Sequence, residues 1–107
     1  MPKITDPNEK NAIKELKKQY KLKDKEFKID ENGFVNIIKL SNKNIHQIPE
    51  QIKALPHLKK LILDYNQIKK MTGFDNLTEL LSLNLGNNQI TRIEGLSELK
   101  ALKILDL

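Results

Sequence analysis

The stretch Leu80–Ala101, LLSLNLGNNQITRIEGLSELKA, carries apolar residues at a fixed spacing. Written from Leu80, it reads L-x-x-L-x-L-x-x-N-x-I-x-x-I-x-x-L-x-x-L. The same spacing occurs directly upstream, starting at Leu58, and Gly73 in that copy matches Gly95 in this one. A pattern of this length, filled twice at one period, indicates stacked copies of a single structural unit.

A less regular copy lies further upstream and begins at Val35, slightly more than one period before Leu58. It has Lys43 where the other copies have asparagine, and Pro49 follows Ile48. The pattern also begins again after Ala101. The sequence therefore predicts three repeats and part of a fourth, which cover residues 35–57, 58–79, 80–101 and, as the partial copy, 102–107.

Each L-x-x-L-x-L segment is expected to form a short strand, and stacking would align these strands in a parallel sheet. Asn66 and Asn88 follow the strands, where their amides can bond the buried backbone of neighbouring turns. Lys43 cannot accept a hydrogen bond, so we expect this ladder to be imperfect in the first repeat. The returning segments IPEQIKAL, TGFDNL and EGLSEL are short, which predicts 3₁₀ or single-turn helix.

Residues 1–34 have a different pattern, which predicts a cap for the open end of the first repeat. Asp6 is expected at the N-cap of a helix over about 7–20, with Pro7 at its first position and Glu9 reaching back to the cap. A strand over about 26–30 and the turn Glu31-Asn32-Gly33 predict a β-hairpin. We expect the cap and the repeats to form one structural domain.

Over residues 35–107 the chain resembles the leucine-rich repeat superfamily. The N-x-I-x-x-I/M-x-G-L/F-x-x-L pattern, which begins at Asn66 and again at Asn88, is similar to the 22-residue class typified by the regulatory subunit of protein phosphatase 1. The helix and the stretch DENGFVNIIKLSNKNI are similar to the cap and first repeat of many prokaryotic and plant members. The resemblance implies an α/β fold, a right-handed solenoid with a parallel concave sheet and short 3₁₀ or α segments on its convex side. It also implies protein binding on the concave face and no catalytic residues.

The repeat pattern predicts which residues face outward from the concave sheet. Several of them are apolar and are flanked by lysines, which favours a recognition patch for an acidic or mixed-charge protein segment over a merely solvated surface. The predicted function is a non-catalytic protein–protein interaction module or scaffold. The candidate partner-binding residues are Ile37, Lys39, Lys60, Ile62, Tyr65, Leu81, Asn84 and Asn87.

The C-terminal repeat is incomplete, and its strand has no predicted cover. Three explanations stay open: the chain is a repeat fragment of a larger protein, the tail frays, or two copies pair as a homodimer through this edge. The pairing would make the chain a self-assembling structural unit. Its edge residues would be Leu102, Ile104, Leu105 and Leu107.

Composition narrows the function classes further. The 107 residues include no cysteine and no apolar run of membrane-spanning length, so we expect a soluble, cytoplasmic protein without a membrane partner. The net charge of +5 comes from lysines interleaved with acids, which argues against nucleic-acid binding. His46 and His57 have no patterned partner and are expected at the surface. No catalytic, cofactor or metal-binding pattern is present, so we expect no enzyme activity, no cofactor and no metal.

Overall fold

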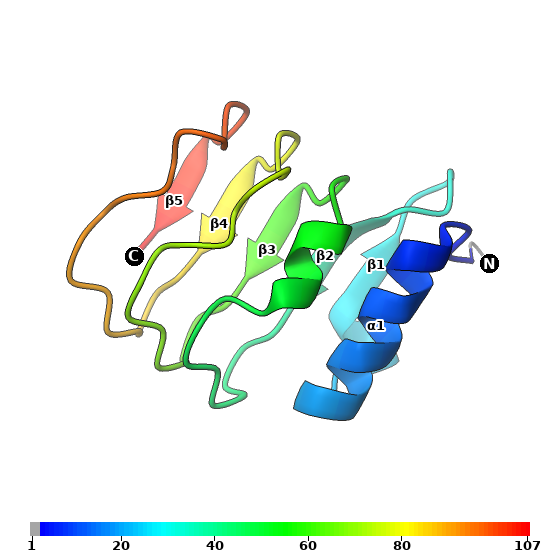
Figure 1. Ribbon diagram of the computed structural model, residues 1–107, viewed down its shortest axis with the longest axis horizontal. Coiled ribbons are helices and arrows are strands. Elements are labelled where there is room, and N and C mark those ends of the chain that lie inside the picture. Colours follow the sequence, from blue (N-terminus) through cyan, green and yellow to red (C-terminus); the bar gives the residue numbers. More distant parts are fainter. Residues whose placement is uncertain (1–2) are drawn as a thin grey trace.

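The computed structural model describes residues 3–107, which contain one α-helix and an open, five-stranded, mostly parallel sheet (Figure 1). The strands lie in the sheet in their sequence order. α1 and β5 lie at opposite ends of the molecule. The elements are α1 (Pro7–Tyr20), β1 (Phe27–Ile29), β2 (Val35–Lys39), β3 (Lys60–Ile62), β4 (Ser82–Asn84) and β5 (Ile104–Asp106), with 3₁₀ helices η1 (Asp24–Glu26) and η2 (Glu50–Ala54).

Helix α1 has the bounds that its apolar spacing predicts. Pro7 occupies the first turn, where its missing N–H costs no helical hydrogen bond. Ala12, Ile13 and Leu16 recur at helical spacing and are buried against the core. The helix ends at Lys21, which adopts a left-handed conformation and donates its N–H to the Leu16 carbonyl.

Asp6 is the N-cap residue, as predicted, but the predicted reach of Glu9 back to the cap is wrong. The Asp6 side chain makes no capping hydrogen bond. Glu9 is fully buried, and its Oε1 accepts a hydrogen bond of 2.7 Å from the Val35 N–H of β2. Burial raises the pKa of the Glu9 carboxyl, although the Val35 hydrogen bond works in the opposite direction. Glu9 therefore ties α1 to β2 instead of closing the helix.

The hairpin predicted for the cap is present. β1 pairs antiparallel with β2, and the turn between them includes Gly33, at a φ of 85°. A Cβ at Gly33 would lie 2.7 Å from Thr5 side-chain atoms, so glycine is needed both for the turn and for the approach of the N-terminal segment. The predicted cap begins at residue 1, and residues 1–2 lie outside the described part of the chain.

The parallel part of the sheet keeps one register from β2 to β5. Ile38 is opposite Leu61, which is opposite Leu83, which in turn is opposite Leu105. The first three are fully buried, because alternate residues of a strand point to opposite faces and this face lies against the core. Figure 1 shows β2 to β5 side by side, with the chain returning through a connection after each of the first three.

Asn66 stabilises the turn after β3, as predicted. Its Oδ1 accepts hydrogen bonds from the N–H groups of Lys43 (2.9 Å) and Ile45 (3.1 Å), and its Nδ2 donates to the carbonyls of Leu40 (2.8 Å) and Leu63 (2.9 Å). Asn88 does the same after β4, since its Oδ1 accepts from Ile68 and its Nδ2 donates to Leu63 and Leu85. These amides satisfy backbone groups that would otherwise be buried without partners.

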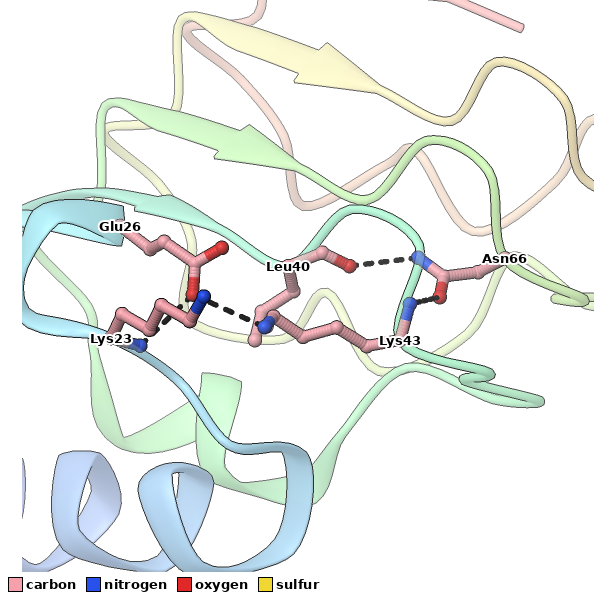
Figure 2. Close-up of polar contacts among 5 residues, drawn as sticks. All are labelled: Lys23, Glu26, Leu40, Lys43 and Asn66. Atoms are coloured by element: carbon pink, nitrogen blue, oxygen red, sulfur yellow. Dashed lines mark hydrogen bonds and ion pairs between the residues drawn. The ribbon is translucent and has the colours of Figure 1, made fainter.

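In the first turn, Lys43 stands where the later turns have asparagine, and it makes a different interaction. Its Nζ lies 3.1 Å from Glu26 Oε1 in the cap, and the exposed fractions of the two side chains are only 12% and 17%. Figure 2 shows the lysine side chain reaching toward Glu26 while its backbone N–H meets Asn66. The Glu26 carboxylate also accepts a hydrogen bond from the Lys23 N–H. The ladder is thus interrupted at Lys43, as expected, but an ion pair with the cap takes its place.

The segments that connect the parallel strands are less helical than predicted. Of the three returning segments, only the one that contains η2 forms a 3₁₀ helix. The other two returning segments, 72–77 and 94–99, are single turns, closed by hydrogen bonds from Leu77 to Phe74 and from Leu99 to Leu96. Gly95 explains the glycine of the motif, because its φ is 73° and a Cβ there would lie 2.2 Å from the Met71 carbonyl oxygen.

Candidate functional site

The outer face of the sheet bears two rows of side chains that run across β2 to β5. The strand register places Ile37, Lys60, Ser82 and Ile104 in one row, and Lys39, Ile62, Asn84 and Asp106 in the other. No residue of either row is buried. Because the alternate residues of these strands point into the core, the two rows form the solvent-facing surface of the sheet.

Exposure differs among the apolar residues predicted for this surface. Ile104 and Leu81 are exposed, but Ile37 and Ile62 are half-buried, which corrects the expectation that both would be open to water. Neighbouring strands of a sheet lie about 4.8 Å apart, so side chains on neighbouring strands within one row shield one another. Lys39 and Lys60 are exposed and leave positive charge beside the two isoleucines.

Tyr65 lies in the turn after β3 and is unusual in both its exposure and its backbone conformation. Its side chain is 60% exposed, and its φ is 56°, in the left-handed region that tyrosine rarely adopts. The corresponding residues of the adjacent turns, Asn42 (φ 54°) and Asn87 (φ 56°), have the same backbone conformation. Asparagine tolerates that conformation far better than a bulky aromatic residue does. The sequence alone already carried this signal, because two of the three copies have asparagine at this position.

Asn84 has a structural role in addition to its predicted place on the outer face. Its Oδ1 accepts a hydrogen bond of 2.9 Å from the Gly86 N–H, which holds the turn after β4. One turn earlier, the Ser41 hydroxyl donates to the Asp64 carboxylate. Asn87, by contrast, is exposed. The polar groups of this face are therefore partly engaged by the turns themselves. The exposed residues among its predicted binding residues are Lys39, Lys60, Tyr65, Leu81 and Asn87.

His57 has a partner that the sequence analysis missed. Its Nδ1 lies 2.8 Å from Glu79 Oε2, and the centroid of its ring lies 3.9 Å from that of Phe34. The signal was available, because Glu79 follows His57 by one repeat period and so occupies the same place in the next turn. His46 is exposed, as expected.

The predicted edge residues differ in accessibility. Leu102 and Leu105 are half-buried and pack against the core, whereas Ile104 is 61% exposed and Leu107 is also exposed. Ile93, which fills an apolar position of the repeat pattern, is 66% exposed. Its counterpart Met71 is fully buried because the Gly95 turn lies over it, and no described turn lies over Ile93 in the same way.

The part of the chain that the structure describes contains no cluster of three or more histidine, cysteine or acidic side chains that could hold a metal ion. Within residues 3–107, no helix is long and apolar enough to cross a membrane. In comparisons with known proteins, no protein-family model matches this chain, and no curated protein matches it either.

Proposed function

We propose that residues 35–107 form a leucine-rich repeat solenoid that binds a protein partner on the outer, concave face of its sheet and has no catalytic role. Two features support the repeat assignment. Parallel strands β3, β4 and β5 begin at equal intervals along the chain, at Lys60, Ser82 and Ile104. Asn66 and Asn88 make equivalent hydrogen bonds after the first two of them. The hairpin and α1 would then serve as the N-terminal cap of the solenoid.

Tyr65 is the observation that carries the binding proposal. A bulky residue in the left-handed conformation costs free energy, about 1 kcal/mol or more, and the neighbouring turns avoid that cost by using asparagine. Because the ring is exposed, hydrophobic burial offsets little of this cost. An aromatic side chain kept in a strained, exposed position is better explained by contact with a partner, where tyrosine is enriched among the residues that dominate binding energy.

The charges around Tyr65 favour an acidic or mixed-charge partner segment. Lys39, Lys59 and Lys60 are exposed on β2 and β3 or beside them. Lysines at the rim of an interface mainly raise the association rate and select partners of opposite charge. Ile62 adds apolar area on β3 between Lys60 and Tyr65, and Leu81 adds more beside Lys59, since its N–H donates to the Lys59 carbonyl. The partner segment should therefore place apolar residues on this face, with acidic residues opposite the lysines.

The test requires a partner defined by contact with this face. A photo-crosslinking amino acid at position 65 would identify proteins that touch the face, and each would then be purified and titrated against the chain. We expect Tyr65→Asn with Lys60→Glu to weaken binding of a true partner at least roughly 30-fold, equivalent to about 2 kcal/mol. The double variant Lys69→Glu with Lys70→Glu, on another exposed segment, should leave binding unchanged. Equal affinity for all three forms would overturn the proposal.

Self-assembly through β5 is a second candidate function. β5 pairs only with β4, and Ile104 and Leu107 are exposed beside its unpaired edge. Light scattering over a concentration series would test it. A homodimer that Ile104→Lys converts to a monomer would support pairing through this edge, and a constant monomer mass would exclude it over the concentrations used. Leu105→Lys is a weaker probe, because Leu105 also packs against the core.

A further inference from the structure

A second surface lies at the opposite end of the molecule from β5, between α1 and β1. It is a groove of about 520 Å³ whose apolar lining comes from the N-terminal segment, the helix and the strand. Four lysines from the N-terminal segment and α1 also line it, and none of the groove's residues is acidic. The lining consists of Ile4, Ile13, Phe27 and Ile29 with Lys3, Lys10, Lys14 and Lys17.

The lysines of α1 are placed along one side of this groove by the helical repeat. Lys10, Lys14 and Lys17 are separated by four and three residues, so they share one helix face. Lys17 is engaged within the chain, since its Nζ lies 2.7 Å from Asp24 Oδ1 and 5.6 Å from the centroid of the Phe27 ring. Across the described residues, Lys3, Lys10 and Lys14 form no ion pair. The groove therefore has positive charge that the chain itself leaves uncompensated.

β1 supplies a second feature that bears on the occupant. Among residues 3–107 it is the end strand of the sheet and pairs only with β2. In an antiparallel end strand, alternate residues direct their N–H and C=O groups away from the sheet, where another extended segment can bond them. Phe27 and Ile29 of this strand are half-buried and face the groove, while Lys28 between them is exposed.

We propose that this groove binds an extended, acidic protein segment that adds to the sheet beside β1. The backbone of the segment would pair with the free edge of β1, and its groove-facing side chains would be acidic, apolar and acidic in turn. The apolar side chain would contact Phe27 and Ile29, and the carboxylates would pair with Lys10 and Lys14. This surface is separate from the Tyr65 face and does not depend on the function proposed there.

The dimensions agree with such a segment. At about 1.5 Å per helical residue, Lys10 and Lys14 lie about 6 Å apart along α1. Two acidic residues four positions apart in an extended chain are separated by about 13 Å, at ~3.3 Å per residue. The two flexible lysine side chains cover this difference by extending in opposite directions along the groove. The whole of α1, at 14 residues, is about 21 Å long and matches about six residues of extended chain.

An anionic membrane would also be attracted to four lysines, but the groove fits it less well. The exposed large apolar residues of the described chain are Tyr65, Leu81, Ile93, Ile104 and Leu107, and none of them lines this groove. Membrane-surface binding requires apolar side chains that enter the lipid from an exposed face. A lipid surface also has no use for the unpaired backbone groups of β1.

The probe is a synthetic peptide of about seven residues, in which glutamate, isoleucine and glutamate occupy alternate positions among threonines. Its binding to the full chain would be followed by fluorescence anisotropy and by NMR shifts of β1 and α1 amides. We expect Lys10→Glu with Lys14→Glu to weaken binding at least about tenfold, since attraction becomes repulsion at two positions. The control is Lys69→Glu with Lys70→Glu, which has the same net charge and should bind as the unchanged chain does.

Five further outcomes decide the proposal. A peptide with lysine in place of both glutamates should not bind, and one N-methylated at alternate residues should lose affinity, because it cannot donate to the β1 edge. Equal weakening by both double variants would reduce the effect to net charge and overturn the site. Binding to phosphatidylserine vesicles without binding to the acidic peptide would overturn it in favour of a membrane surface. Loss of peptide binding in Tyr65→Asn would place the peptide on the other face, which also overturns it.

Discussion

Lys43 Nζ lies 3.1 Å from Glu26 Oε1, at the position where the next two turns use the amides of Asn66 and Asn88. The ammonium group therefore joins the first turn to the cap, whereas each asparagine joins its turn to the turn before it. Both side chains of the ion pair are largely withdrawn from water, so each depends on the other for a charge partner.

Lys43→Met should destabilise the fold by about 3 kcal/mol, because it leaves the Glu26 carboxylate largely buried without its cation. Urea unfolding at pH 7 measures this. The control is Lys53→Met, which breaks the more exposed, 3.9 Å pair with Asp75 and should cost no more than about 0.5 kcal/mol. Similar losses for the two variants would show that burial does not distinguish the two ion pairs.

Asn66→Ala should cost about 3 kcal/mol or more, because it leaves the N–H groups of Lys43 and Ile45 and the Leu40 carbonyl without their partner. Asn88→Ala should cost less, since Asn88 is only half-buried and accepts one backbone hydrogen bond instead of two. Thermal unfolding followed by circular dichroism would rank the two variants. The reverse order would contradict the role assigned to burial.

Gly95→Ala should destabilise the fold by about 2 kcal/mol, because the new Cβ would meet the Met71 carbonyl oxygen at 2.2 Å and the backbone φ is 73°. Gly73→Ala provides the comparison, since its Cβ would lie 3.3 Å from the Ile48 Cβ, a tight contact that is much less severe than the one at Gly95. We expect a smaller loss there, caused mainly by its φ of 90°. Equal unfolding midpoints for both variants would exclude the steric explanation.

Glu9 and Glu26 should affect stability in opposite directions as pH changes. Burial alone would raise the pKa of Glu26, but the Lys23 hydrogen bond and the Lys43 ion pair outweigh it and lower that pKa below 4.5. Glu26 therefore stabilises the fold above pH 4.5, and this contribution is lost as pH falls through its lowered pKa. Burial raises the pKa of Glu9 above 4.5, so its contribution is full below pH 4.5 and is lost as pH rises through the raised pKa.

The measurement is the free energy of unfolding from pH 3 to pH 8 for the unchanged chain, Glu9→Gln and Glu26→Gln. Relative to Glu9→Gln, the unchanged chain should gain stability as pH falls. Relative to Glu26→Gln, the unchanged chain should lose stability as pH falls through the acidic part of the range. Parallel curves for all three proteins would refute both assignments.

Tyr65→Asn should stabilise the free chain by about 0.5–1 kcal/mol, because asparagine accepts the left-handed conformation that tyrosine resists. The same substitution is expected to weaken partner binding, so stability and binding should change in opposite directions. Tyr65→Phe keeps the ring and the strain and should leave stability within about 0.3 kcal/mol. A destabilised Tyr65→Asn chain would show that the ring supports the fold after all.

The repeat spacing predicted most of the sheet, because burial of every second strand residue and a fixed period are properties that a sequence displays directly. It placed Leu61, Leu83 and the amide of Asn66 correctly. It did not predict the long-range partners of charged residues. Glu9 looked like a local capping residue, yet it bonds the backbone of Val35, 26 positions away. Such contacts depend on how the cap packs against the sheet, which local spacing does not contain.

The outer face was predicted less well for a related reason. The alternation of residues along a strand tells which side chains point away from the core. Their exposure also depends on side chains of the neighbouring strands, so Ile37 and Ile62 are more covered than alternation suggests. The groove between α1 and β1 had no counterpart in the sequence analysis. Its lining joins the N-terminal segment, the helix and the strand, which come together only in the folded chain.

The equivalent hydrogen bonds of Asn66 and Asn88 make the segment 58–79 an interchangeable length of chain. Excising this segment would bring Asn88 to the place of Asn66, with the same kinds of backbone group to bond. If the chain is the repeat solenoid proposed above, whole turns could be duplicated or deleted with their junctions still matched. Lys43 is the exception, because its ammonium pairs with the carboxylate of Glu26, and so it distinguishes the turn after β2 from the two that follow.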